Sequence, residues 1–336
     1  MLLLGIETSC DDTAAAVVED GRVVRSSVST NQDAFHAKYG GIVPEIASRQ
    51  HVALLSAAVE DAAGRAQVSL QQIDGIAVTR GPGLIGSLVV GVAAAKALAF
   101  SLNKPLYGVN HLHGHIYAAF LDRDDVPEYP FLTLLVSGGH SQLVDVQSPT
   151  SMTVIGRTKD DAAGEAYDKT ARLLGLGFPG GPALDKLARD GNAQAIAFPR
   201  HRAEGDSLDM SFSGVKTAVR YFVESPEGAQ TSKEDVAASF QAAVVDVLMQ
   251  RVADAFERSA YTSAVLSGGV AANSALQRAL REWGERNGVR VFIPPPKYCT
   301  DNAAMIAAAA FYQGDAVRAD PLELSADPNL PFAPGA

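Results

Sequence analysis

Three histidines alternate in the segment His111-Leu112-His113-Gly114-His115. On a helix, His111 and His115 differ by about 40° around the axis and share a face, whereas His113 points roughly 160 to 200° away. Two imidazoles one turn apart can chelate one metal ion, with a third ligand from elsewhere in the chain. Asp301 follows a triproline segment, where a loop could deliver it. The alternative is that these histidines cap a helix or face solvent, and the spacing alone leaves that possibility open.

The same histidine spacing occurs in zinc peptidases with the motif H-E-x-x-H, in which a glutamate directly after the first histidine is the general base. Leu112 occupies that position in this chain. His113 cannot replace the glutamate, because it faces away and is a different kind of base. The sequence therefore argues against a peptidase.

Three carboxylates, Glu7, Asp11 and Asp12, lie in a polar turn after the first apolar run of the chain. Carboxylates beside a phosphate site usually organise metal ions or take a proton. The alternative is an exposed hairpin with turn-forming aspartates. This turn is therefore a candidate catalytic loop.

Four glycine-rich turns interrupt the chain, and two of them connect a strand to a helix. Residues without a Cβ let backbone N–H groups approach an anion, and a helix N-terminus adds positive potential. One such turn is usually an ordinary tight turn, but four in one chain indicate a nucleotide cleft. They are Gly81-Pro82-Gly83, Ser137-Gly138-Gly139, Pro179-Gly180-Gly181-Pro182 and Ser267-Gly268-Gly269.

The elements around these residues repeat. Apolar runs at residues 2–6 and 13–18 with a polar turn between them predict a β-hairpin, and the pattern returns at residues 131–136 and 141–146. A duplicated hairpin indicates duplicated domains, and a chain of 336 residues is long enough for two. Short strands before glycine turns give each half an α/β character, at residues 76–79 and 264–266.

Helix signals flank these strands. Pro44 stands where a helix would begin, and Ser232 with Asp235 three residues later predicts a capping box for an amphipathic helix. A short alanine-rich helix is predicted over residues 302–312. The residues from Asp320 onward are weakly patterned and are expected to form a tail.

Composition limits the function classes. Lys and Arg total 28 against 38 Asp and Glu, a net charge of −10, so an RNA substrate would need a local basic patch or a partner. Two cysteines, Cys10 and Cys299, cannot build a disulfide framework, which favours a reducing compartment. The N-terminus lacks the basic start of a signal peptide. The longest apolar stretch, residues 88–102, carries Lys96 and is shorter than the roughly 20 residues of a membrane span. We therefore expect a cytoplasmic protein.

Taken together, these motifs resemble one family, the tRNA adenosine threonylcarbamoyltransferases (TsaD), formerly labelled O-sialoglycoprotein endopeptidases. The resemblance covers nearly the whole chain, and so many motifs in one order make coincidence implausible. Besides the histidine motif, the segments that carry it are Gly5-Ile6-Glu7-Thr8-Ser9-Cys10-Asp11-Asp12-Thr13, Gly40-Gly41-Ile42-Val43-Pro44-Glu45, Gly81-Pro82-Gly83-Leu84, Leu135-Val136-Ser137-Gly138-Gly139-His140, residues 161–169, Pro179-Gly180-Gly181-Pro182, Ser211-Phe212-Ser213-Gly214-Val215-Lys216-Thr217 and residues 267–273.

The resemblance implies an α/β, actin-like fold (ASKHA, ribonuclease H-like) with two lobes, duplicated domains and a central nucleotide cleft. The expected lobes are residues 1–128 and 129–301. A terminal helix over residues 302–316 would pack back on the N-terminal lobe, and residues 317–336 would form the tail.

The resemblance also implies a metal-dependent acyl transfer. A threonylcarbamoyl group would pass from threonylcarbamoyl-AMP, made by a separate synthase, to the N6 amine of adenosine 37 in tRNAs that read codons beginning with A, and AMP would be released. The implied partners are tRNA, a non-catalytic paralogue (TsaB) and a small ATPase (TsaE), with no membrane involved.

Carried over by motif position, the implied metal ligands are His111, His115 and Asp301, and the ion would be Fe²⁺ by resemblance, with Zn²⁺ as an alternative. The implied adenylate-binding residues are Leu135, Val136, Ser137, Gly138, Gly139, Asp168, Gly181, Asp185 and Asn273.

The acceptor is an exocyclic amine, so the reaction needs a group that takes its proton. We expect Asp11 to be that base, with Glu7 behind it and Asp12 in the same turn. Backbone N–H groups of Ser137-Gly138-Gly139 would stabilise developing negative charge. The chain departs from the family pattern at Asp12 and His113, where glutamate is usual. Asp12 shortens a side chain near the reacting centre, whereas His113 is expected off the metal face.

Two other classes share part of this pattern. A sugar or acetate kinase would have the fold and the glycine turns, but it would not need the histidine pair. A non-catalytic scaffold paralogue would be expected to lack His111, His115 and Asp301. The presence of all three favours the enzyme.

Overall fold

The computed structural model describes residues 1–39, 41–177, 179–203 and 205–333. Gly40 of the second motif and the last three residues of the expected tail lie outside the described residues. The chain divides into two compact units. Unit 1 is Met1–Val126, Ser148–Ser151 and Pro294–Ala336, and unit 2 is Pro127–Gln147 and Met152–Ile293. The domain boundaries expected from the sequence stay a prediction.

Unit 1 contains a six-stranded sheet in the order β11-β5-β4-β1-β2-β3. The predicted first hairpin is confirmed, because β1 and β2 are antiparallel, with Leu2 opposite Glu19. β4 runs parallel to both β1 and β5. The strands are β1 (Leu2–Glu7), β2 (Thr13–Glu19), β3 (Val23–Thr30), β4 (Gly75–Gly81), β5 (Leu106–Asn110) and β11 (Arg318–Ala319).

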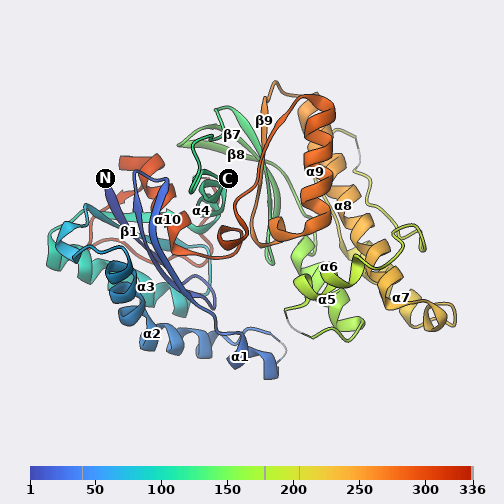
Figure 1. Ribbon diagram of the computed structural model, residues 1–336, viewed down its shortest axis with the longest axis horizontal. Coiled ribbons are helices and arrows are strands. Elements are labelled where there is room, and N and C mark those ends of the chain that lie inside the picture. The colour runs from blue at the N-terminus through green and yellow to red at the C-terminus, as the bar shows by residue number, and fades with distance from the viewer. Residues whose placement is uncertain (40, 178, 204, 334–336) are drawn as a thin grey trace. The chain divides into compact units, whose positions relative to one another are not determined.

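Helices cover both faces of this sheet (Figure 1). Leu4 and Ile6 point to the face that packs on α2 (Pro44–Arg65) and α3 (Ile85–Leu102). Gly5, between them, points to the opposite face, where α10 (Ala303–Gln313) lies so close that a Cβ would sit 2.1 Å from the Ala303 carbonyl oxygen. The remaining helices of this unit are α1 (Asp33–His36) and α4 (His111–Tyr117). Close packing on this face of the sheet therefore fixes the position of α10 and of the residues just before it.

Unit 2 repeats this architecture around a five-stranded sheet in the order β10-β9-β6-β7-β8. β6 pairs antiparallel with β7 and parallel with β9, as β1 does with β2 and β4. The predicted second hairpin and the predicted duplication are thus confirmed. The strands are β6 (Phe131–Val136), β7 (Ser141–Ser148), β8 (Ser151–Arg157), β9 (Ser263–Ser267) and β10 (Arg290–Phe292), and the helices are α5 (Ala163–Leu173), α6 (Gly180–Ala188), α7 (Ser213–Val223), α8 (Lys233–Glu257) and α9 (Ser274–Asn287).

The predicted cap of α8 is half confirmed. Ser232 Oγ accepts a hydrogen bond from the Asp235 N–H (3.1 Å), as a capping box requires. The Asp235 carboxylate does not return to the Ser232 backbone, because it accepts instead from the N–H of Asn192 (2.7 Å). Asp235 therefore fastens a distant loop to the helix start.

The C-terminal segment expected to be a tail packs on unit 1. We call its described part, residues 320–333, the C-terminal strap. Leu324 and Phe332 are buried in it, the Asp327 N–H donates to the Arg80 carbonyl (2.8 Å), and Lys96 Nζ donates to the Leu324 carbonyl (3.0 Å). The strap thus has a fixed course along the unit.

Two helices of the described chain, α3 and α8, are long and apolar enough to cross a membrane by length and composition alone. Val92 and Ala95 of α3 lie in the core of unit 1, and most of the apolar window of α8 is buried inside unit 2. Packing against the sheet and α2 buries one side of α3, and packing against neighbouring helices buries most of α8. The rest of α3 carries an exposed apolar stripe that is considered below.

Candidate functional site

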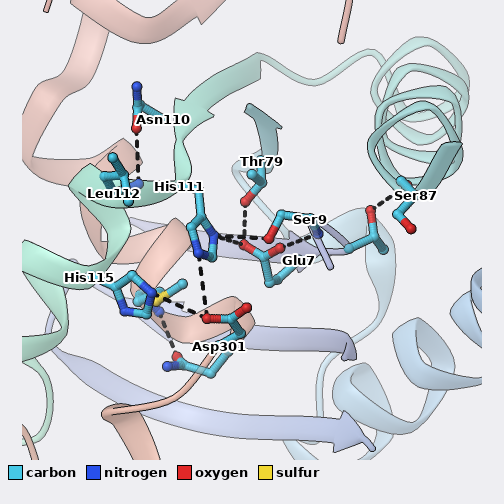
Figure 2. Close-up of polar contacts among 12 residues, drawn as sticks. Glu7, Ser9, Thr79, Ser87, Asn110, His111, Leu112, His115 and Asp301 are labelled. Carbon is cyan, nitrogen blue, oxygen red and sulfur yellow. Dashed lines mark hydrogen bonds and ion pairs between the residues drawn. The ribbon is translucent and has the colours of Figure 1, made fainter. Parts of the chain in front are cut away.

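The histidine pair is positioned by the junction of β5 and α4. Asn110, the last residue of β5, caps the helix, and its Oδ1 accepts from the Leu112 N–H (2.9 Å). One turn of helix then places His111 and His115 on the same face, with ring centroids 4.7 Å apart (Figure 2). His113 faces elsewhere, and its Nε2 donates to the Phe332 carbonyl (2.7 Å). The predicted arrangement of the three histidines is confirmed.

Asp301 stands two residues before α10 and reaches the histidine pair, as predicted. Its Oδ1 lies 3.2 Å from His115 Nε2 and 3.5 Å from His111 Nε2. One ligand atom from each of the three residues lies within 4.8 Å of the others. Two imidazoles and one carboxylate in this arrangement are a donor set that suits a divalent transition metal with an open coordination position.

His115 supplies a test of whether a metal ion fits here. Its side chain is 1% exposed, and within the described residues neither ring nitrogen has a partner in hydrogen-bond geometry, although Nε2 is close to Asp301. Burying such a nitrogen without a partner is unfavourable. A cation between His111, His115 and Asp301 would satisfy it, so the residues present fit a metal.

Glu7 holds His111 from the other side (Figure 2). Its Oε2 lies 3.0 Å from His111 Nδ1 and also accepts from Thr79 Oγ1 (2.5 Å), while Oε1 accepts from the Ser9 N–H (2.5 Å). Nδ1 of His111 is thereby engaged, and Nε2 is left facing Asp301. This carboxylate–histidine pair is the arrangement that orients metal-ligating imidazoles and makes them more basic.

The charged side chains of this buried group shift one another's pKa values. Burial opposes ionisation of Glu7, but the positive charge and hydrogen bond of His111 outweigh it and hold the pKa of Glu7 below its usual value. Burial likewise opposes protonation of His111, yet Asp301 and Glu7 raise its pKa well above the usual value. Burial is again outweighed at Asp301, where the two histidines lower the pKa. The site is therefore built to hold positive charge between two carboxylates.

Asp11 and Asp12 lie half-buried in the turn between β1 and β2. Burial, with the negative charge of Asp301 adding to it, raises the pKa of Asp11 and raises that of Asp12 to about 8. The buried ring of His51, from α2, bridges the two ends of this turn, with Nδ1 2.8 Å from Thr13 Oγ1 and Nε2 3.0 Å from the Cys10 carbonyl. Both aspartates belong to the same polar region as Asp301.

The predicted adenylate-binding residues all lie in unit 2 and form one connected group. Leu135 and Val136 are buried in β6, and the turn that follows packs so closely on α5 that a Cβ on Gly164 would sit 2.5 Å from the Ser137 carbonyl. The Ser137 N–H is not free, because it donates to the His140 carbonyl within the turn (2.7 Å). The N–H groups of Gly138 and Gly139 are therefore the better candidates to contact the donor, and the role expected for this turn stays a prediction.

The other members of this group are held by contacts among themselves and their neighbours. Asp168 Oδ1 accepts from the Gly181 N–H (3.1 Å). Asp185 Oδ1 accepts from Ser274 Oγ (2.9 Å), and Asn273 Nδ2 donates to Gln241 Oε1 (2.7 Å). Residues from four helices thus converge on the end of β6 and β9.

Several residues of the site have no signal in the sequence. Thr79 and Ser9 support Glu7, His51 holds the aspartate turn, and Gln241 holds Asn273. Thr79 is 72 residues from Glu7 in the chain. Ser9 belongs to a quoted motif, but its contact with Glu7 depends on the backbone path of the turn.

Comparison with known proteins agrees with this geometry. The family model of the tRNA N6-adenosine threonylcarbamoyltransferases (TsaD) matches residues 23–308. Two curated relatives bear the same name. That of Moorella thermoacetica is 52% identical over 98% of this chain and 97% of its own length, and that of Symbiobacterium thermophilum is 53% identical over 98% and 96%.

Solved structures of more distant proteins support the fold alone. Full-length HypF, in a phosphate- and nucleotide-bound form, is similar with a TM-score of 0.62 at 14% identity over 95% of this chain, which spans 47% of HypF. Component A of the (R)-2-hydroxyglutaryl-CoA dehydratase of Acidaminococcus fermentans gives a TM-score of 0.54 at 16% identity, over 93% of this chain and 98% of that one. These likenesses confirm the actin-like α/β fold. With half of its residues shared with curated relatives along nearly its full length, the chain belongs to the tRNA N6-adenosine threonylcarbamoyltransferase family, the acyltransferases that modify tRNA.

Proposed function

We propose that this chain transfers the threonylcarbamoyl group from threonylcarbamoyl-AMP to the N6 amine of adenosine 37 in tRNAs reading codons that begin with A, releasing AMP. The observation that carries this assignment is the buried group of His111, His115 and Asp301 with Glu7 behind it. A small-molecule kinase of this fold has no use for such a group, and a scaffold paralogue would not maintain it.

His111, His115 and Asp301 would hold one divalent ion. Imidazole and carboxylate ligands suit both Fe²⁺ and Zn²⁺, and Fe²⁺ is the first choice by resemblance to the family. The bound ion would supply Lewis acidity toward the threonylcarbamoyl group. Glu7 has both oxygens engaged, so its part in this proposal is to orient His111 rather than to take the substrate proton.

The donor's adenylate would bind at the group in unit 2 that runs from Leu135 to Gly139 and includes Asp168, Gly181, Asp185 and Asn273. The N–H groups of Gly138 and Gly139 would donate to the oxygen that becomes negative as the amine attacks. Apart from the adjacent residues of the turn, no atom of the described residues lies within 4 Å of a Cβ position on either glycine, which leaves room for a ligand against this turn.

Asp11 would accept the proton that the N6 amine loses when it forms the new bond to carbon, and the bond to the AMP phosphate oxygen would break. Asp12 lies beside it in the same turn and is the second candidate. Partial burial raises the pKa of Asp11, which makes its carboxylate a stronger base for this role.

A partner is also proposed, in the form of the non-catalytic paralogue (TsaB) together with the small ATPase (TsaE), in the cytoplasm. The exposed side of α3 is apolar along its length, formed by Ile85, Val89, Ala93, Ala97 and Phe100. An exposed stripe of this kind marks a protein interaction site. Val89→Asp should abolish stable association with the paralogue in sedimentation velocity, whereas Val23→Asp, an exposed valine on β3, should not. Equal association of both variants with the paralogue would refute this assignment.

The transfer itself is tested with radiolabelled threonine, using the adenylate synthase and partner proteins in the mixture. Label should reach tRNA with the wild-type chain and fail to do so with a His111→Ala, His115→Ala double variant. Asp11→Asn should bind metal as the wild type does and lose most of the transfer rate. Full activity of Asp11→Asn would remove it as the base, and no label from the wild type in a competent mixture would refute the reaction.

A further inference from the structure

Unit 2 contains a cavity of about 440 Å³ between a loop and one face of α8. The loop contributes Arg200, His201, Arg202 and Ala203, and the helix contributes Asp246, Val247, Gln250, Arg251 and Asp254. The helical residues follow the three- and four-residue spacing of a single face. None of these residues belongs to the metal group or to the predicted adenylate site.

The lining of this cavity carries an excess of positive charge, although the chain as a whole has a net charge of −10. Arg200 donates to Asp246 Oδ2 (2.8 Å), and Arg251 donates to Asp254. Both aspartates are therefore already neutralised by arginines. Arg202 is exposed and makes no ion pair or hydrogen bond with any other residue in the described ranges. Its guanidinium is available to an anion.

A second arginine lies deeper in the cavity. Arg251 is 6% exposed, and in the part of the chain that the structure describes its Nε is buried without a hydrogen-bond partner, as is Nδ1 of His201. Leaving a buried donor of a charged group without an acceptor is unfavourable. An entering oxyanion would supply acceptors to Arg251 and Arg202 together, and the planar fork of a guanidinium matches a phosphate group.

We propose that this cavity binds a backbone phosphate of the substrate tRNA. The family's reaction brings an RNA polyanion to a chain whose overall charge repels it. A local cluster of arginines on the chain is one of the two ways to offset that repulsion, the other being a partner, and this cavity supplies such a cluster. Gln250 in the cavity lies about 180° around α8 from Gln241, the residue that supports the predicted adenylate site. The two sites thus face opposite sides of one helix, which suits a ligand that extends well beyond the reacting adenosine.

The test measures the dissociation constant of tRNA for the complete complex across a range of KCl concentrations, with no donor present. Arg202→Gln should weaken binding roughly tenfold at low salt and lower the slope of log Kd against log salt by about 1, as expected for one lost phosphate contact. The matched control is Arg286→Gln, which removes the same charge from α9, where the side chain donates a hydrogen bond to the Glu282 carbonyl (3.2 Å). It should leave the slope unchanged.

A charge-neutral pair, Arg251→Gln with Asp254→Asn, removes the buried guanidinium without altering net charge and should lower the slope as well. Equal slopes for wild type and Arg202→Gln would overturn the proposal. The phosphate group could belong to tRNA or to a small phosphorylated compound, and titration with inorganic phosphate alone separates the two. If Arg202→Gln weakens phosphate binding but not tRNA binding, the cavity is assigned to a small phosphorylated compound. The inference rests on the RNA substrate of the family, and because binding is measured without catalysis, loss of transfer activity and loss of this site are distinguishable.

Discussion

Both carboxylate oxygens of Glu7 are engaged by neighbours, and one of those neighbours is the metal-ligand candidate His111. Glu7→Gln keeps the shape of the side chain but removes the charge that opposes a metal-bound imidazole. Loss of such a supporting carboxylate weakens metal affinity by about 10- to 100-fold. Competition with a chelator, followed by elemental analysis, measures this effect. Thr79→Val, which removes only one hydrogen bond to Glu7, should have a smaller effect, and an unchanged affinity in Glu7→Gln would contradict the assigned role.

The absence of a side chain at Gly5 allows α10 to pack close to the sheet. A Cβ at this residue would sit 2.1 Å from the Ala303 carbonyl oxygen, so Gly5→Ala must push the helix away and should destabilise the protein by about 1–3 kcal/mol. Gly64, near the end of α2, has no atom within 4 Å of a Cβ position. Gly64→Ala should therefore stabilise by up to about 1 kcal/mol through helix propensity. Urea unfolding of both variants measures the two signs, and a neutral Gly5→Ala would show that α10 can shift freely.

At the scale of elements, the hairpins and the histidine helix were predictable because their signals are local. Short apolar runs with a polar turn between them mark β1, β2, β6 and β7, and a four-residue spacing fixes the relation of His111 to His115. The partner of a side chain is a different matter. Ser232 caps α8 as its sequence indicates, but Asp235 bonds to Asn192, 43 residues away. Contacts such as this one and that of Thr79 with Glu7 depend on strand order and register, which no local pattern contains.

The start of α7 is tied to the loop before α5 by two neighbouring aspartates. Asp160 accepts from Ser211 Oγ (2.5 Å) and Ser213 Oγ (2.6 Å), and Asp161 forms ion pairs with Lys169 and Lys216. Burial alone would raise the pKa of Asp161, but the hydrogen bonds and charges of the two lysines outweigh it and lower the pKa. The loop therefore holds α7 only while these carboxylates are ionised.

A group whose pKa is lowered by folding stabilises the folded state above its unfolded pKa and loses that contribution as the pH falls toward the folded value. The unfolded pKa of an aspartate is about 3.9, so the contribution of Asp161 should be complete at pH 7 and should decline below about pH 4. In urea unfolding at pH 7 and at pH 3.5, Asp161→Asn should destabilise less at the lower pH. In a Lys169→Met, Lys216→Met background this difference should disappear or reverse, because burial alone raises the pKa of Asp161. A penalty that is independent of pH in both backgrounds would contradict the ion-pair account.

At the scale of the molecule, the C-terminal strap fastens the helix that carries the histidines. Asn110 caps α4 through Oδ1 and donates through Nδ2 to the Pro331 carbonyl (3.0 Å), and His113 donates to the Phe332 carbonyl. A chain ending at residue 319 loses these contacts. Hydrogen exchange of the α4 amides should then be faster, and less metal should be retained. Exchange in β6, which lies in the other unit, serves as the control, and unchanged protection of α4 would show that the strap does not support it.

The discontinuity of unit 1 has a consequence for how the protein is made. Strands β1 and β2 leave the ribosome before unit 2, but α10, which covers the face of Gly5, is translated only after all of unit 2. At roughly 5–20 residues per second, the intervening residues 127–293 take about ten to thirty seconds to synthesise. During that interval the nascent chain presents an apolar strand surface that has no cover. We expect the first sheet to be a binding site for ribosome-associated chaperones until α10 has emerged.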